Sequence, residues 1–100
     1  MPYRLRIAEA VWLQADAIDA WWRANRRSAP RLFRDELEAA LDRLETAPLT
    51  AGRYGHEGQP TELRRLLLPR SRYWVYFEIE ADIVTVLAVW HGARGKGPPL

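Results

Sequence analysis

The stretch RRLLLPRSRYWVYFEIEADIVTVLAVWHGAR, residues 64–94, decides the fold. In residues 73–80 the odd positions are all apolar or aromatic and the even positions include two glutamates, which is the period of two expected of a strand. Residues 83–90 are almost continuously apolar and rich in valine, as in a central strand buried on both faces. Residues 63–68 form a third apolar run, and short polar turns separate the three. The sequence therefore predicts a meander of three antiparallel strands.

The chain before this meander changes its hydrophobic period. Residues 3–8 alternate as a short strand does. From residue 9 to about residue 25 the apolar side chains recur at helical spacing, and a second helical pattern continues to about residue 46. Ser28 is expected to cap this second helix, with Pro30 in its first turn. The residues expected to pack the two helices on the sheet are Val11, Ile18, Trp22, Phe33, Leu37, Leu41 and Leu44.

The order of predicted elements is strand, helix, helix, strand, strand, strand. Helices that are segregated from the later strands indicate the α+β class. We therefore expect a β-α-α-β-β-β fold in which a helical hairpin packs on a mainly antiparallel sheet. Trp12 and Trp21 flank the first helical stripe and are expected at the edge of the core. Residues 1–100 fit one domain, in which residues 48–60 form the only long irregular segment.

Composition narrows the classes of function. The 100 residues include no cysteine, which excludes disulfides and thiolate metal sites. No run approaches the roughly 20 apolar residues of a membrane span, and the first residues show no apolar leader region. We therefore expect a cytoplasmic protein without membrane contact. The net charge of +2 does not by itself indicate nucleic-acid binding.

Common signatures of catalysis are missing from the sequence. It has no phosphate-binding glycine loop, no H-E-x-x-H and no G-x-S-x-G. His56 and His91 are the only histidines, and neither has a second ligand at a metal-site spacing. His56 is expected to be a plain surface residue, and for His91, at the end of the last strand, hydrogen bonding is favoured over catalysis. The sequence predicts no catalytic residue, no metal and no cofactor.

Arginines and aromatic residues around the meander are the candidate binding residues. The arginines could hold phosphates or a partner's carboxylates, or they could simply keep strand edges soluble. Trp74 and Tyr76 fall on the strand face opposite Val75 and Phe77, so an open face would present them to a protein partner. The alternative is that the N-terminal strand and the glycine-rich loop cover this face. The full set of candidates is Arg64, Arg65, Arg70, Arg72, Trp74, Tyr76, Trp90, His91 and Arg94.

Motifs spread over nearly the whole chain carry a resemblance to a known family. In order, they are Tyr3-Arg4-Leu5, Phe33 with Leu37-x3-Leu41-x2-Leu44 and Pro48, Leu63-Arg64-Arg65, Tyr73-x2-Tyr76 with Val86-x2-Val89, and His91-Gly92-x-Arg94. Each motif is short, and their shared order and spacing give the resemblance its specificity. The chain resembles the ParE/RelE superfamily of bacterial type II toxins, which are also called plasmid stabilisation proteins.

The resemblance implies different activities for the two branches. RelE-like members cut messenger RNA in the ribosome with basic residues on the sheet and a tyrosine or similar residue near the C-terminus. This chain has Tyr73 where that branch carries an arginine, leucines at 66–68 in place of lysines, and no tyrosine after Arg94. The ParE branch, which the chain resembles better, lacks the ribonuclease residues and inhibits DNA gyrase. In both branches the flexible C-terminal part of an antitoxin wraps the toxin.

We therefore interpret the chain as a ParE-like toxin that binds DNA gyrase, is neutralised by a cognate antitoxin and performs no chemistry of its own. Contact with DNA is expected only through the antitoxin. One alternative is a RelE-like, ribosome-dependent mRNA interferase that would hold and polarise the RNA backbone. The residues for that role would be Arg64, Arg65, Arg72, His91 and Arg94. Another alternative is an inactive structural relative that only pairs with a partner.

Overall fold

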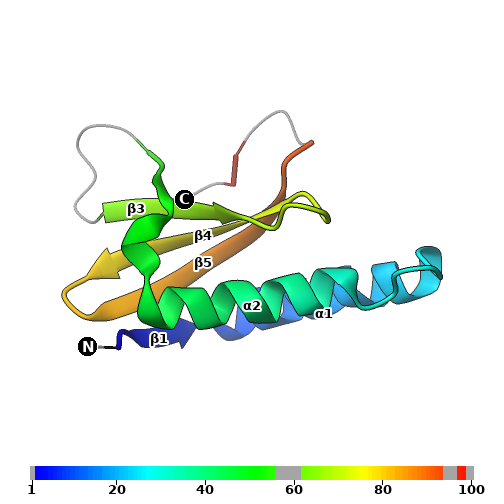
Figure 1. Ribbon diagram of the computed structural model, residues 1–100, viewed down its shortest axis with the longest axis horizontal. Coiled ribbons are helices and arrows are strands. Elements are labelled where there is room, and N and C mark those ends of the chain that lie inside the picture. Colours follow the sequence, from blue (N-terminus) through cyan, green and yellow to red (C-terminus); the bar gives the residue numbers. More distant parts are fainter. Residues whose placement is uncertain (1, 56–61, 94–96, 99–100) are drawn as a thin grey trace.

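The predicted meander is present and forms the middle of the sheet. A computed structural model describes residues 2–55, 62–93 and 97–98 of the chain. In it β3 (Glu62–Leu67), β4 (Tyr73–Glu80) and β5 (Ile83–His91) pair antiparallel in sequence order (Figure 1). The turns between them are short, as the sequence predicts for a meander.

Two further strands extend the meander to a five-stranded mixed sheet with the order β1-β5-β4-β3-β2. β1 (Arg4–Ile7) pairs parallel with β5, and β2 (Gly52–Arg53) pairs antiparallel with β3. A short 3₁₀ helix, η1 (Pro48–Thr50), precedes β2. Sequence patterns predict an irregular segment here, because a strand of two residues has no period to detect. The α+β class and the β-α-α-β-β-β layout are confirmed, with the two-residue β2 added before the meander.

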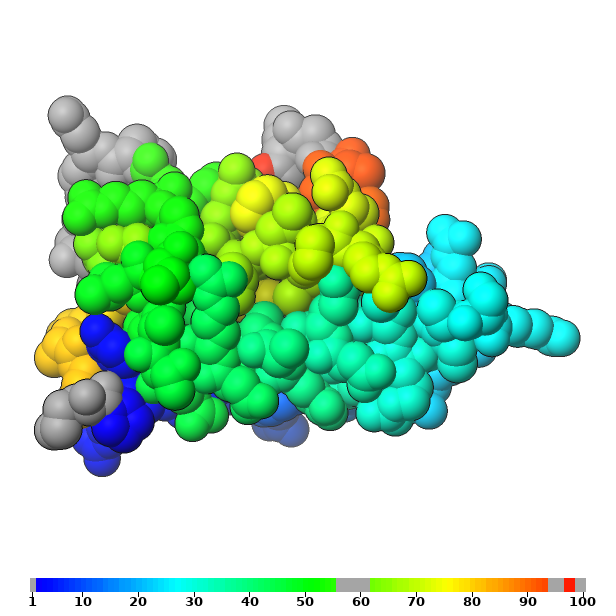
Figure 2. All heavy atoms as spheres, viewed as in Figure 1, coloured from blue at the N-terminus to red at the C-terminus, as the bar shows by residue number. Residues whose placement is uncertain are grey.

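Two helices, α1 (Glu9–Asn25) and α2 (Leu32–Thr46), lie side by side on one face of the sheet (Figure 1). The bounds of α1 are those predicted from its apolar spacing. The hairpin is longer than the sheet beneath it, so its tip at residues 26–31 projects beyond the strands, as Figure 2 shows in cyan. This projection leaves one end of α1 close to the ends of β4 and β5.

The start of α2 differs from the prediction. The N-cap position is Arg31, without a capping hydrogen bond from its side chain, so the prediction that Ser28 caps the helix is wrong. Pro30 disfavours helical backbone in the residue before it, which delays the first helical turn. A hydrogen bond of 3.2 Å from the Leu32 N–H to the Ala29 carbonyl closes the connecting turn instead.

The core lies between the hairpin and the sheet. All seven helix residues predicted to pack there do so, and Ile18 and Leu41 are the two that remain partly exposed. From β4 the odd-numbered residues predicted to face the helices join the same cluster, which confirms the alternation. These residues are Tyr73, Val75, Phe77 and Ile79.

The two tryptophans expected at the edge of the core lie on the surface. Trp12 is 38% exposed and Trp21 is 48% exposed. They flank the buried stripe of α1 on opposite sides, because residues nine apart on a helix differ by about 180° around its axis. Only Trp21 lies near the ends of the strands, where it contacts Trp22 edge-on with 6.0 Å between ring centres.

Candidate functional site

The sheet face opposite the helices carries aromatic rings around one arginine. The guanidinium carbon of Arg65 lies 3.9 Å from the centre of the Trp74 ring and 5.0 Å from that of Tyr54. Its Nη1 donates to the Tyr76 hydroxyl at 3.4 Å. Trp90 lies opposite Trp74 across the β4–β5 ladder, and both tryptophans are partly exposed. Cation–π contacts of this kind contribute about 0.5–2 kcal/mol, so neighbouring rings hold Arg65 against the sheet.

Tyr76 is not on an open surface, since loop and tail residues cover it and leave it only 2% exposed. The Tyr54 ring meets it edge-on with 4.9 Å between ring centres. Gly97 approaches Tyr54 so closely that a Cβ at this position would collide with the tyrosine hydroxyl, and Pro98 beside it is buried. The expectation of an open aromatic face is therefore wrong at Tyr76. The cover comes from residues 97–98 and from Tyr54, which belongs to the glycine-rich segment 48–60 named in the alternative, whereas the N-terminal strand lies at the edge of the sheet.

Arg64 lies on the helix side of β3 and is buried. Its Nε donates to the Glu62 carboxylate at 2.9 Å, and its Nη1 donates to the carbonyl oxygens of Leu49 and Ala51. The ion pair holds the pKa of Glu62 below its ordinary value, mainly through the hydrogen bond from Arg64. Arg64 therefore ties η1 and β2 to the sheet, and little of its side chain is available to a partner.

The turn between β3 and β4 presents Arg70 and Arg72, which are both exposed. Glu36 of α2 fixes this turn, because its carboxylate accepts hydrogen bonds from the backbone N–H of Arg70 at 2.9 Å and of Ser71 at 2.8 Å. Arg72 has a positive φ of 68°, a conformation that few residues other than glycine adopt readily. The two arginines share one turn, as the sequence predicts.

His91 ends β5 next to this turn. Its Nδ1 accepts a hydrogen bond of 3.0 Å from the Ala93 N–H, which agrees with the expected hydrogen-bonding role. Its ring meets that of Tyr73 edge-on with 4.8 Å between centres. Gly92 then passes so close to the Arg72 carbonyl that a Cβ would approach it to 3.2 Å. The remaining candidate, Arg94, lies outside the described residues, as does His56.

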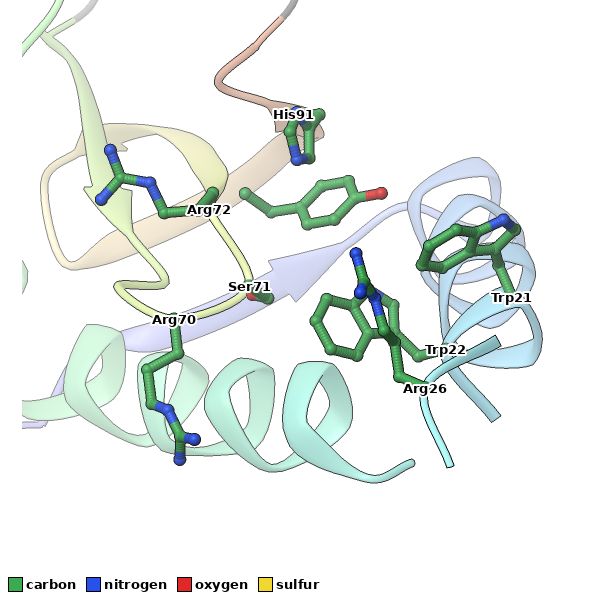
Figure 3. A pocket seen from close by; sticks show the side chains of 8 residues that line it. Trp21, Trp22, Arg26, Arg70, Ser71, Arg72 and His91 are labelled. Atoms are coloured by element: carbon green, nitrogen blue, oxygen red, sulfur yellow. The ribbon is translucent and has the colours of Figure 1, made fainter. Parts of the chain in front are cut away.

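A pocket of about 390 Å³ opens between the end of α1, the β3–β4 turn and the end of β5 (Figure 3). Gln14 holds α1 in this position, because its Oε1 accepts a hydrogen bond of 3.0 Å from the Val89 N–H, beyond the end of β1. The residues that line the pocket are Trp21, Trp22, Arg26, Arg70, Ser71, Arg72, Tyr73 and His91. Sequence reasoning missed the contribution of α1, because only the tertiary fold brings residues 21–26 to the turn.

The part of the chain that the structure describes contains no group of three or more histidine and carboxylate side chains placed to hold a metal ion. Among the same residues, no helix combines the length and the apolar character needed to cross a membrane.

The protein has a small α+β fold in which a helical hairpin packs on a mixed sheet, and arginines and tryptophans gather at one end. This arrangement agrees with the class of protein that the sequence motifs indicate. Comparison with known families identifies it further. The family described as the ParE toxin of the type II toxin-antitoxin system, parDE, matches residues 5–95, and the chain belongs to this family. A search of curated proteins finds no match to the chain. The resemblance inferred from the motifs is therefore confirmed at the level of the family.

Proposed function

We propose that this protein arrests bacterial growth by binding DNA gyrase and has no enzymatic activity of its own. The match of residues 5–95 to the ParE toxin family carries the proposal, since this is the branch whose resemblance implies gyrase inhibition. The geometry supports it. Arg64 is occupied by backbone carbonyls and Arg65 by aromatic rings, so two arginines that an RNA-cutting site would need already have partners in the fold. A gyrase target would place the action in the cytoplasm.

Induction of the protein alone in bacteria tests this proposal. We expect growth arrest with a DNA-damage response, while messenger RNA on ribosomes stays intact. Co-expression of the protein encoded beside it should restore growth. Cleavage of messenger RNA at the ribosomal A site without DNA damage would favour the RelE-like alternative, and the absence of any arrest would favour an inactive relative.

We further propose that an antitoxin neutralises the protein by covering Trp74 and Trp90 on the sheet together with the β3–β4 turn. Both tryptophans are partly exposed. Arg70 and Arg72 are exposed, and within the described residues neither guanidinium forms an ion pair. A disordered tail loses conformational entropy on binding and needs a large surface with a few strong anchors. A tail with apolar side chains and interspersed carboxylates meets these requirements on this surface.

Titration of variants against the purified antitoxin candidate tests the proposed surface. Arg72→Glu should slow association and reduce its salt dependence, because it reverses a charge at the rim. Trp74→Ala should mainly speed dissociation, because it removes an apolar anchor. Arg27→Glu is the matched control, since Arg27 is exposed at the tip of the hairpin and carries the same charge change.

If the wild type and all of these variants bind with equal affinity and equal salt dependence, the antitoxin binds elsewhere on the protein. The alternative is the apolar pocket of about 270 Å³ between α2 and β3, lined in part by Ala40, Leu66 and Leu68. On the side of β3 that faces away from β4, β2 pairs with Arg64 and Arg65, and the described residues provide no strand partner for Leu66 and Leu67. An extended peptide could pair there.

A further inference from the structure

The pocket at the end of α1 is lined by positive, hydroxyl and aromatic side chains, without a carboxylate among them. Glu36, which fixes the turn, already accepts hydrogen bonds from two backbone N–H groups, and Asp19, one helical turn before Trp22, is paired with Arg23 and Arg34. In Figure 3 the Arg26 side chain, which follows the last residue of α1, extends beside Trp22 in the direction of His91. Its guanidinium carbon lies 5.6 Å from the ring centres of both Trp21 and Trp22. Aromatic contacts thus hold a positive charge at the pocket.

Two buried hydrogen-bond donors in this lining have no partner. Ser71 is 3% exposed and Trp22 is 8% exposed. Among the residues that the structure describes, the Ser71 hydroxyl and the Trp22 indole Nε1 form no hydrogen bond. A buried polar group without a partner destabilises a fold, so such groups in native proteins usually serve a purpose. Both residues line the same pocket as Arg26, so a small movement of either side chain on binding would offer its buried donor to a ligand that accepts hydrogen bonds.

We infer that this pocket binds the phosphate group of a small phosphorylated ligand. An indole N–H and a guanidinium can only donate hydrogen bonds, so the bound group must accept them and carry negative charge. Phosphate offers three terminal oxygens and close to two negative charges, which matches the indole, hydroxyl and guanidinium donors better than a carboxylate does. Arg70 and Arg72 extend away from the pocket in Figure 3. Both are exposed, so either can rotate toward a bound dianion.

The rim of the pocket favours a nucleoside monophosphate as the ligand. Trp21 is half exposed there and offers a ring face on which a base can stack. The pocket volume of about 390 Å³ lies within the range common for small-molecule sites. This inference is independent of the gyrase and antitoxin proposals, because the orphan donors and Arg26 carry it.

Nuclear magnetic resonance of the tryptophan indole N–H groups tests the inference at constant ionic strength. The probes are inorganic phosphate, adenosine 5′-monophosphate, adenosine and glutamate. Phosphate and the monophosphate should both shift the Trp22 indole signal, and the monophosphate should bind more tightly and also shift Trp21. Adenosine and glutamate should leave the Trp22 signal in place. If neither phosphate probe moves it, or if glutamate moves it as strongly as phosphate, the inference is wrong.

Two variants and one control sharpen this test. Arg26→Gln should weaken phosphate binding at least about tenfold, since hydrogen bonds to charged groups are among the strongest. Arg27→Gln should change it less than about twofold, because Arg27 is exposed to solvent and does not line the pocket, so salt screens its charge. Equal loss in the two variants would mean that only general charge matters and would contradict a defined site.

Ser71→Ala separates binding from folding. The substitution removes a buried hydroxyl without a partner, while the backbone N–H that bonds to Glu36 remains. Without ligand, the melting temperature should therefore stay the same or rise. The increase in melting temperature on adding phosphate should become smaller, because a ligand that binds more weakly stabilises the folded state less at the same concentration. An unchanged phosphate-dependent increase would overturn the role assigned to Ser71.

Discussion

Single arginines have different roles in this fold although the sequence groups them together. Arg64 is buried and bonded to backbone carbonyls, Arg65 is packed among rings, and Arg72 is exposed on a turn. Sequence alone could not separate these roles. The burial of Arg64 depends on η1 and β2, whose contacts come from a segment without any period.

Replacing Arg64 tests its structural role. Arg64→Ala should lower the free energy of unfolding by about 1–3 kcal/mol, because the carbonyls of Leu49 and Ala51 lose their donor in a buried place. Arg70→Ala is the control, since this exposed side chain makes no ion pair among the described residues, and its effect should stay within about 0.5 kcal/mol. Urea unfolding measures both. Similar effects would show that Arg64 does not hold η1 and β2.

Glu62, which forms an ion pair with Arg64, makes the stability of the fold depend on pH. Its pKa is lowered from an ordinary value of 4.5 by the hydrogen bond from Arg64, with a further contribution from the charge of Arg53. A carboxylate with a lowered pKa stabilises the fold above its ordinary pKa, and this contribution is lost as pH falls through the folded-state value. Glu62→Gln should therefore reduce the acid-induced loss of stability below about pH 4.5. Unfolding curves of both proteins from neutral to acidic pH provide the check, and identical acid profiles would contradict the assignment.

At the scale of elements, hydrophobic period explains what the sequence could predict. The meander and α1 have long, regular patterns, and their bounds were close to those observed. The start of α2 was misplaced because Ser28 offers a capping signal that Pro30 overrides. β2 escaped prediction, and cover over Tyr76 by the glycine-rich loop was predicted only as an alternative, since both depend on contacts between distant segments.

The helix stripe also gives a graded prediction of stability. Leu44 is fully buried in the core, whereas Leu41 on the same helix is only partly buried. Leu44→Ala should lower the free energy of unfolding by about 2–5 kcal/mol, through lost burial and the cavity left behind. Leu41→Ala should have a smaller effect, because part of its side chain already contacts water. Thermal or urea unfolding compares the two, and a larger loss for Leu41→Ala would contradict the packing of α2.

At the scale of the whole molecule, two proposed binding surfaces lie at the same end of the protein and are separate from each other. The tryptophans of the sheet face belong to the proposed antitoxin surface, and the α1 pocket belongs to the proposed phosphate site. The β3–β4 turn borders both, because Glu36 fixes it against α2 and its arginines remain exposed. An antitoxin bound across the turn would therefore lie close to any ligand in the pocket. The sequence predicted the arginines of this turn but not the end of α1, which lies more than forty residues earlier.

The supercoiling activity of purified DNA gyrase is the measurement that tests the central claim most directly. The wild-type protein should inhibit supercoiling in a dose-dependent manner, and prior addition of the protein encoded beside it should prevent the inhibition. Ribosomes translating a defined messenger, treated in parallel, should show no cleavage. Unaffected gyrase together with cleavage of ribosome-bound messenger would contradict the account and assign the protein to the RNA-cutting branch of the superfamily.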